Sequence, residues 1–100
     1  MALRIGQDYK YVGDDYWEWS VWIDGPKKEL DRVESVTYTL HPTFPKPVRI
    51  VESREDRFRL STAGWGVFTL YAKVEHKDGS TERLKHELEL RYPDGKLTSA

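Results

Sequence analysis

Hydrophobic and polar residues alternate along most of the chain with a period of two. From Trp17 to Asp24 the apolar residues hold the odd positions, and polar residues share the even positions with Trp22. This period is typical of a β-strand that buries one face. We therefore expect the odd-numbered side chains to face a core and Trp22 to lie on the solvent face. No segment has the period of an amphipathic helix.

The same alternation predicts further strands. It is clear at residues 35–40, 67–74 and 84–90, and weaker at residues 2–11, 48–52 and 58–61. The pair Asp78-Gly79 tolerates the positive φ angles of a tight hairpin turn, so residues 77–80 are expected to connect two strands. Seven or eight short strands separated by regular turns predict an all-β fold, an antiparallel β-sandwich.

The pattern also assigns individual side chains to the core or the surface. The large rings expected in the core are those of Trp17, Trp19, Tyr38 and Phe68. Ser35 falls on the polar face of its strand, whereas His86 falls on an apolar face and should be a hydrogen-bonded core or edge histidine. His76 borders the hairpin turn, where we expect it to be exposed.

Length and composition favour one small domain. The chain has 100 residues and a mass of 11.8 kDa, enough for a single hydrophobic core. Hydrophobic residues make up only 38%, but four Trp and six Tyr supply a large apolar area. Pro93 precedes an Asp-Gly pair, so we expect residues 1–93 to form the domain and residues 94–100 to be a tail or the start of a linker.

Charge and side-chain chemistry exclude several functions. Sixteen basic and seventeen acidic residues give a net charge of -1, which does not fit a nonspecific nucleic-acid binder, although a local basic patch around residues 46–59 stays open. There is no Cys, and three scattered His residues have no ligand spacing, so we expect no metal, no cofactor and no thiol chemistry. No apolar run could span a bilayer and no secretory segment begins the chain, so we expect an intracellular protein.

Two aromatic segments carry the strongest functional signal. Phe44 lies in the Pro-rich segment 40–45, and Trp65 lies between two glycines in the segment 64–68. Turns lie on the surface and often carry function. If the fold brings these turns together, the two rings become opposite walls of a narrow slot with the hydroxyl of Thr43 at its side, and such a slot suits a flat, neutral amide. Read without the other segment, either ring could instead plug the core.

These segments, with the Trp-led strand that closes on Gly25-Pro26, resemble the YEATS domain, a family of immunoglobulin-like modules that read acylated lysine. The three blocks occur in the family's order, and the similarity runs from about Trp19 to Leu90. The block Leu-His-x-Thr-Phe-Pro at residues 40–45 is the most specific. The compact chain looks more like the prokaryotic branch. A pocket aromatic that eukaryotic readers often add from the first loop has no clear counterpart in residues 14–17.

The resemblance implies a ligand and a set of residues that bind it. Those residues are His41, Thr43, Phe44, Gly64, Trp65 and Gly66. Phe44 and Trp65 would stack on the acyl amide, Thr43 would hydrogen-bond it, and His41 would brace the hydroxyl. A backbone N-H of the Trp65 turn would bind the acyl carbonyl. Gly66 would leave room for a long acyl group, so crotonyl-lysine is preferred and acetyl-lysine comes next. Unmodified lysine should be rejected, because neither turn offers a carboxylate to a buried ammonium.

Other functions fit the sequence less well. An enzyme is not expected, because no Ser stands in a nucleophile motif and the acids are scattered over strand faces. A carbohydrate-binding sandwich could use Trp22, Trp65 and Tyr71 as a platform, and a purely structural interaction module would need none of these rings. The expected partner is an acylated-lysine peptide or protein. We expect a monomer, within a larger multidomain protein, that is cytoplasmic if prokaryotic and nuclear if eukaryotic.

Overall fold

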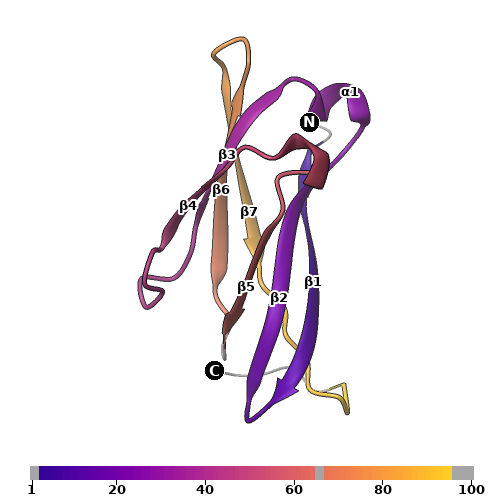
Figure 1. Ribbon diagram of the computed structural model, residues 1–100, viewed down its shortest axis with the longest axis vertical. Coiled ribbons are helices and arrows are strands. Elements are labelled where there is room, and N and C mark those ends of the chain that lie inside the picture. Colours follow the sequence, from indigo (N-terminus) through magenta and orange to yellow (C-terminus); the bar gives the residue numbers. More distant parts are fainter. Residues whose placement is uncertain (1–2, 65–66, 96–100) are drawn as a thin grey trace.

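The computed structural model describes residues 3–64 and 67–95. Over these residues, seven β-strands form two antiparallel sheets that pack face to face (Figure 1). The strands are β1 (Arg4–Gly13), β2 (Tyr16–Asp24), β3 (Val33–Thr39), β4 (Val48–Val51), β5 (Leu60–Gly64), β6 (Thr69–His76) and β7 (Thr81–Glu87). One sheet has the order β1-β2-β5 and the other has the order β4-β3-β6-β7. This architecture confirms the predicted all-β immunoglobulin-like sandwich.

Two short helical turns interrupt the strands, although no helical period is visible in the sequence. They are α1 (Lys27–Leu30) and the 3-10 turn η1 (Arg54–Asp56). Each is too short to show a period, and α1 buries only Leu30. Neither turn has the length or apolar character that a bilayer-crossing helix requires.

Strand β2 is the central strand of the smaller sheet, and its odd-numbered side chains are buried as expected. Trp17 and Trp19 are at most 2% exposed. Trp22 points away from the core and lies flat on the outer face, where a Cβ added at Gly6 would stand only 2.5 Å from its Nε1 atom. The guanidinium of Arg59 covers the ring at 4.7 Å from its centroid. The outer face is therefore partly covered by its own side chains.

Tyr38 of β3 and Phe58 join the two sheets at the centre of the core. Both are fully buried, and the Tyr38 hydroxyl donates a hydrogen bond of 2.6 Å to the Phe58 carbonyl. Burial raises the pKa of Tyr38 well above its usual value. Arg57 and Phe58 have left-handed φ angles of 55° and 57°, which aim the Phe58 side chain inward just before β5 begins. The weak alternation at residues 58–61 predicted a strand but not this anchor.

Ser35 lies on the polar face, as predicted: it pairs with Glu75 of β6, its hydroxyl donates to the Glu75 carboxylate at 3.2 Å, and it is buried there. Two assignments of single side chains were wrong. His76 is not exposed: it is half-buried, with Nε2 3.4 Å from a Glu82 carboxylate oxygen. Phe68 is half-buried instead of belonging to the core.

The segment that follows β7 binds back to the first hairpin. The side-chain amide of Gln7 donates to the Glu89 carbonyl at 2.7 Å and accepts from the Glu89 N-H at 2.9 Å. Its oxygen also lies 2.5 Å from Nε2 of His86. The indole N-H of Trp17 donates to the Arg91 carbonyl at 2.8 Å. His86 is thus the hydrogen-bonded edge histidine that the sequence predicted. The expected tail, residues 94–100, falls mostly outside the described residues.

Candidate ligand-binding site

The loop between β3 and β4 is closed and stiffened before any ligand arrives. The N-H of Leu40 donates to the Pro47 carbonyl at 2.6 Å, and the N-H of Phe44 donates to the His41 carbonyl at 3.0 Å, which forms a β-turn. The loop contains Pro42, Pro45 and Pro47, whose φ angles are fixed. It therefore loses less conformational entropy on folding than a loop without proline would. The turn presents three of the candidate residues, at positions 41, 43 and 44.

His41 fixes the orientation of the Thr43 hydroxyl. The backbone N-H of Thr43 donates to Nδ1 of His41 at 3.3 Å, so Nδ1 is an acceptor and carries no proton. The Thr43 Oγ1 atom lies 2.9 Å from the same Nδ1 and therefore donates its own proton to it. Both side chains are exposed. The free lone pairs of the hydroxyl oxygen remain available to accept a hydrogen bond from a ligand N-H.

Phe44 belongs to an aromatic cluster drawn from both sheets. The cluster consists of Trp19, His41, Phe44 and Phe68. The Phe44 ring lies 5.5 Å from Phe68 and 6.2 Å from Trp19, and Trp19 lies 5.8 Å from Phe68. Phe44 is only half-buried. One side of its ring is thus supported by the core, and the rest of it is accessible.

At Gly64 the candidate segment 64–68 comes into contact with the candidate segment 40–45. Gly64 ends β5 opposite Trp17, and a Cβ added to it would lie 3.5 Å from Cζ of Phe44 and 3.6 Å from Nε1 of Trp19. The structure thus gathers four of the six predicted residues, namely His41, Thr43, Phe44 and Gly64. The other two, Trp65 and Gly66, lie outside the described residues. Figure 1 shows β5 ending and β6 beginning in the lower half of the molecule, toward which β3 also runs before the loop to β4.

Sequence reasoning missed the contribution of Trp19 and Phe68 to this site. Both were assigned to the core alone, since alternation reports the face of a strand but not the end at which a ring lies. The Nε1 atom of Trp19 is buried and has no hydrogen-bond partner among the described residues. An unpaired buried N-H is uncommon, and this one stands directly behind Gly64.

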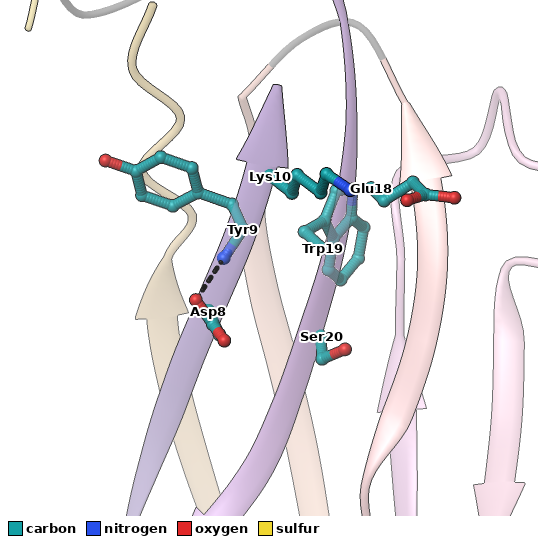
Figure 2. Close-up of a pocket in the computed structure, with 6 residues that line it drawn as sticks. All are labelled: Asp8, Tyr9, Lys10, Glu18, Trp19 and Ser20. Atoms are coloured by element: carbon teal, nitrogen blue, oxygen red, sulfur yellow. Dashed lines mark hydrogen bonds between the residues drawn. The ribbon is translucent and has the colours of Figure 1, made fainter. Parts of the chain in front are cut away.

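A separate pocket lies on the paired strands β1 and β2 (Figure 2). It is lined by Asp8, Tyr9, Lys10, Glu18, Trp19 and Ser20. Lys10 stands opposite Glu18 in the strand register, so the charges in it are mixed. None of the six predicted binding residues lines it. Within residues 3–64 and 67–95, no group of His, Asp and Glu side chains is arranged to hold a metal ion.

Two of the three rings of the alternative carbohydrate platform lie on different faces, and the third, Trp65, lies outside the described residues. Trp22 lies on the outer face of the sheet β1-β2-β5, whereas Tyr71 alternates with buried residues of β6 and lies on the outer face of the other sheet. Because the two faces point in opposite directions, the two rings cannot contact one sugar chain. This part of the alternative prediction was wrong.

Comparison with known families gives one match that covers most of the chain. A family model described as the prokaryotic YEATS domain matches residues 17–89. Curated relatives include a protein AF-9 homolog of Eremothecium gossypii, 34% identical over 68 residues, which are 66% of this chain and 32% of the relative. Another is the transcription initiation factor TFIID subunit 14 of Schizosaccharomyces pombe, 34% identical over 77 residues, or 71% of this chain and 31% of the relative. The matched part is about a third of these relatives.

Solved structures with the same fold include two complexes of one yeast domain. The Yaf9 YEATS domain recognizing an H3K122suc peptide has a TM-score of 0.74 and 26% identity, and the alignment covers 97% of this chain and 77% of that one. The Yaf9 YEATS domain bound to H3K27ac has a TM-score of 0.73 and 25% identity, with 96% and 78% covered. One complex holds an H3K122suc peptide and the other H3K27ac.

Proposed function

The chain belongs to the YEATS domain family, and from this premise we propose that it binds acylated lysine at the surface formed by His41, Thr43, Phe44 and residues 64–66. YEATS domains are reader modules and not enzymes. The observation that carries the proposal is the pair of hydrogen bonds from Thr43 to His41, beside the half-buried ring of Phe44.

The Thr43 hydroxyl supplies the polar contact. Its proton is committed to Nδ1 of His41, so its oxygen acts as an acceptor. An acylated lysine carries one amide N-H at the end of its apolar stem, and this N-H is the donor that the oxygen requires. Unmodified lysine presents three donors and a charge, and the segment 40–47 contains no acid to pair with it. Burying that charge unpaired would cost several kcal/mol.

Phe44 supplies one apolar wall, and we propose Trp65 as the other. The contacts of Phe44 with Trp19 and Phe68 hold its ring in place, so little entropy is lost when a ligand stacks on it. A planar amide stacked on an aromatic ring gains roughly 0.5 to 1.5 kcal/mol beyond simple burial. A conjugated crotonyl group extends the stacked surface, and Gly66 has no side chain to block it, so we place crotonyl-lysine before acetyl-lysine.

The relatives suggest, by analogy, which protein could carry the modified lysine. The two Yaf9 complexes hold histone H3 peptides, and the curated relatives include a transcription factor subunit. A histone tail in a nucleus and an acylated protein in a bacterial cytoplasm would present the same side chain. We therefore propose the acylated side chain itself as the ligand.

Peptide binding measured by calorimetry tests the proposal. One peptide sequence is prepared with crotonylated, acetylated and unmodified lysine, and a glycan panel is tested in parallel. We expect binding of the first two peptides only, with the crotonylated one tighter. Phe44→Ala and Trp65→Ala should both abolish or strongly weaken binding while circular dichroism stays unchanged.

A matched control separates loss of binding from loss of folding. Tyr71→Ala removes an exposed ring that alternates with buried residues of β6 and so lies on the outer face, not on the face that packs against the core, and it should bind acylated peptide as the parent does. Equal affinity for all three peptides, or binding retained by Phe44→Ala, would exclude the acyl-lysine site.

A further inference from the structure

Strand β4 leaves one edge of the larger sheet open. Among the described residues it pairs with β3 alone, so the row of backbone groups on its other side has no strand beside it. Open edges are templates for pairing with another extended chain, and proteins normally block them with Lys, Pro or a bulge. What β4 offers at this edge can be worked out from its register.

The hydrogen-bond phase identifies the free backbone groups. The N-H of Leu40 bonds the carbonyl of Pro47, so residues 40 and 47 form a hydrogen-bonded pair. Such pairs alternate in an antiparallel ladder, which makes the next pair, Thr39 with Val48, a non-hydrogen-bonded one, and likewise Thr37 with Ile50. The N-H and C=O groups of Val48 and Ile50 therefore point away from β3, toward the open edge.

The same two residues expose large apolar side chains. Val48 is 56% exposed and Ile50 is 68% exposed, although both belong to a regular strand. Tyr71, 52% exposed, continues this surface because Thr39 lies between it and Val48 in the cross-strand row. Backbone donors, backbone acceptors and apolar side chains thus coincide at one edge.

Charge decides between two occupants of this edge. Lys46 precedes β4 and Arg49 lies within it, and the nearest acid in sequence is Glu52, directly after β4. Neither cation has an ion-pair partner among the described residues; Nε of Arg49 donates to the Lys46 carbonyl at 2.6 Å. A second copy paired antiparallel with Val48 opposite Ile50 would place Arg49 opposite Arg49, where like charges repel, and would pair Lys46 with Glu52. An acidic strand can place a carboxylate beside each cation, so it fits this edge better than a second copy does.

We propose that β4 is a docking site for an extended, acidic segment of a partner protein, which adds to the sheet as a fifth strand. Apolar residues of the segment lie beside Val48 and Ile50 on the outer face, and an Asp or Glu between them lies beside Arg49. The hydrogen bonds to Val48 and Ile50 supply affinity, and the alternation of apolar and acidic residues supplies specificity. This surface is distinct from the acyl-lysine site and does not depend on it.

The test uses a short labelled peptide in which Val or Ile alternates with Glu, and a matched peptide with Lys in place of Glu. We expect the Glu peptide to bind in fluorescence anisotropy, to bind roughly tenfold more tightly than the Lys peptide, and to slow amide exchange at Val48 and Ile50. Ile50→Pro removes an N-H only at the open edge and should weaken binding roughly tenfold. Ile50→Gln, which needs no change of φ and adds no charge, should do the same.

Binding of acylated peptide should be unchanged in both variants, which separates this proposal from the previous one. Glu-peptide binding that persists in Ile50→Gln, or the absence of any protection at Val48 and Ile50, would overturn the docking site. Sedimentation that shows a dimer lost in Ile50→Gln would overturn it as well, because it would assign the edge to a second copy of the chain.

Discussion

The ring of Phe44 lies against Gly64, so that a Cβ at residue 64 would stand 3.5 Å from Cζ of the ring. Phe44 is carried by a loop of the larger sheet, whereas Gly64 ends the edge strand β5 of the smaller sheet. The two sheets therefore meet at the candidate site, and a change at Gly64 reaches the ligand surface through the Phe44 ring.

Substitutions at Gly64 should separate stability from binding. A distance of 3.5 Å is an ordinary van der Waals contact, so Gly64→Ala fits and should leave the free energy of unfolding within about 1 kcal/mol of the parent. Gly64→Leu adds atoms where the Phe44 ring stands, so it should displace the ring and weaken binding of acylated peptide. Urea unfolding and calorimetry measure the two effects. Full binding by Gly64→Leu would show that Phe44 is not a wall of the site.

Thr43 offers a test of the hydrogen bond alone. Thr43→Val keeps the shape but removes the hydroxyl, so acyl-lysine binding should weaken by about 1 to 2 kcal/mol. Thr43→Ser keeps the hydroxyl next to His41 and should retain most of the affinity. Calorimetry with the acetylated peptide gives both values. Equal affinity in the Val and Ser variants would remove Thr43 from the recognition of the amide.

Tyr38→Phe should destabilise the fold without affecting the ligand. The variant leaves the buried Phe58 carbonyl without the 2.6 Å hydrogen bond it now accepts, at a cost of about 1 to 3 kcal/mol. Urea unfolding followed by fluorescence measures this loss. Tyr71→Phe is the matched control, because its hydroxyl is on an exposed side chain. Equal stability of the two variants would contradict a structural role for the Tyr38 hydroxyl.

The two buried indoles of β2 differ in one hydrogen bond. Trp17 donates to Arg91 at 2.8 Å, whereas Nε1 of Trp19 has no partner among the described residues. Both substitutions to Phe leave a similar cavity, so Trp17→Phe should be the more destabilising by about 1 kcal/mol. Thermal and urea unfolding of the pair check the difference. A larger loss in Trp19→Phe would indicate that its N-H is satisfied by a water or a residue that the structure does not describe.

Stability should fall in mildly acidic solution because of His86. Burial lowers the pKa of its imidazole, and the nearby Glu89 and Glu87 oppose this only in part. The unfolded state then binds the proton more readily than the folded state, so the stabilisation is complete above about pH 6.5 and is lost as the pH falls through the folded-state pKa. In His86→Gln the fall in unfolding free energy between neutral and acidic pH should be smaller. Parallel curves for the two proteins would assign the pH effect elsewhere.

Much of the fold could be predicted because a strand that buries one face has hydrophobic residues at every second position. Trp17 and Trp19 face the core and Trp22 does not, as the alternation indicated. A bulge breaks this rule: one extra residue between Val33 and Ser35 lets Val33 be buried together with Val36 and Tyr38, although strict alternation would put Val33 on the opposite face. The position of Phe58 depends on the left-handed φ angles of Arg57 and Phe58, and no local sequence pattern predicts such angles at residues other than glycine.

The candidate site could be predicted only in part, because it is assembled from segments far apart in the chain. The motif at residues 40–45 named His41, Thr43 and Phe44. The neighbours that support Phe44, namely Trp19 and Phe68, come from β2 and from the approach to β6, and their ring contacts depend on how the two sheets are stacked. Periodicity within one strand contains no information about that stacking.

The bonds that tie the end of the chain to its beginning have a consequence for synthesis. Gln7 and Trp17 can form these bonds only after Glu89 and Arg91, which are among the last residues of the domain, have left the ribosome. A nascent chain can pair β1 with β2 early, but its Trp17 N-H stays unsatisfied until Arg91 has left the ribosome. The fold therefore cannot close before residues 89–91 are available, and a chain that stalls after β7 would be exposed to proteolysis.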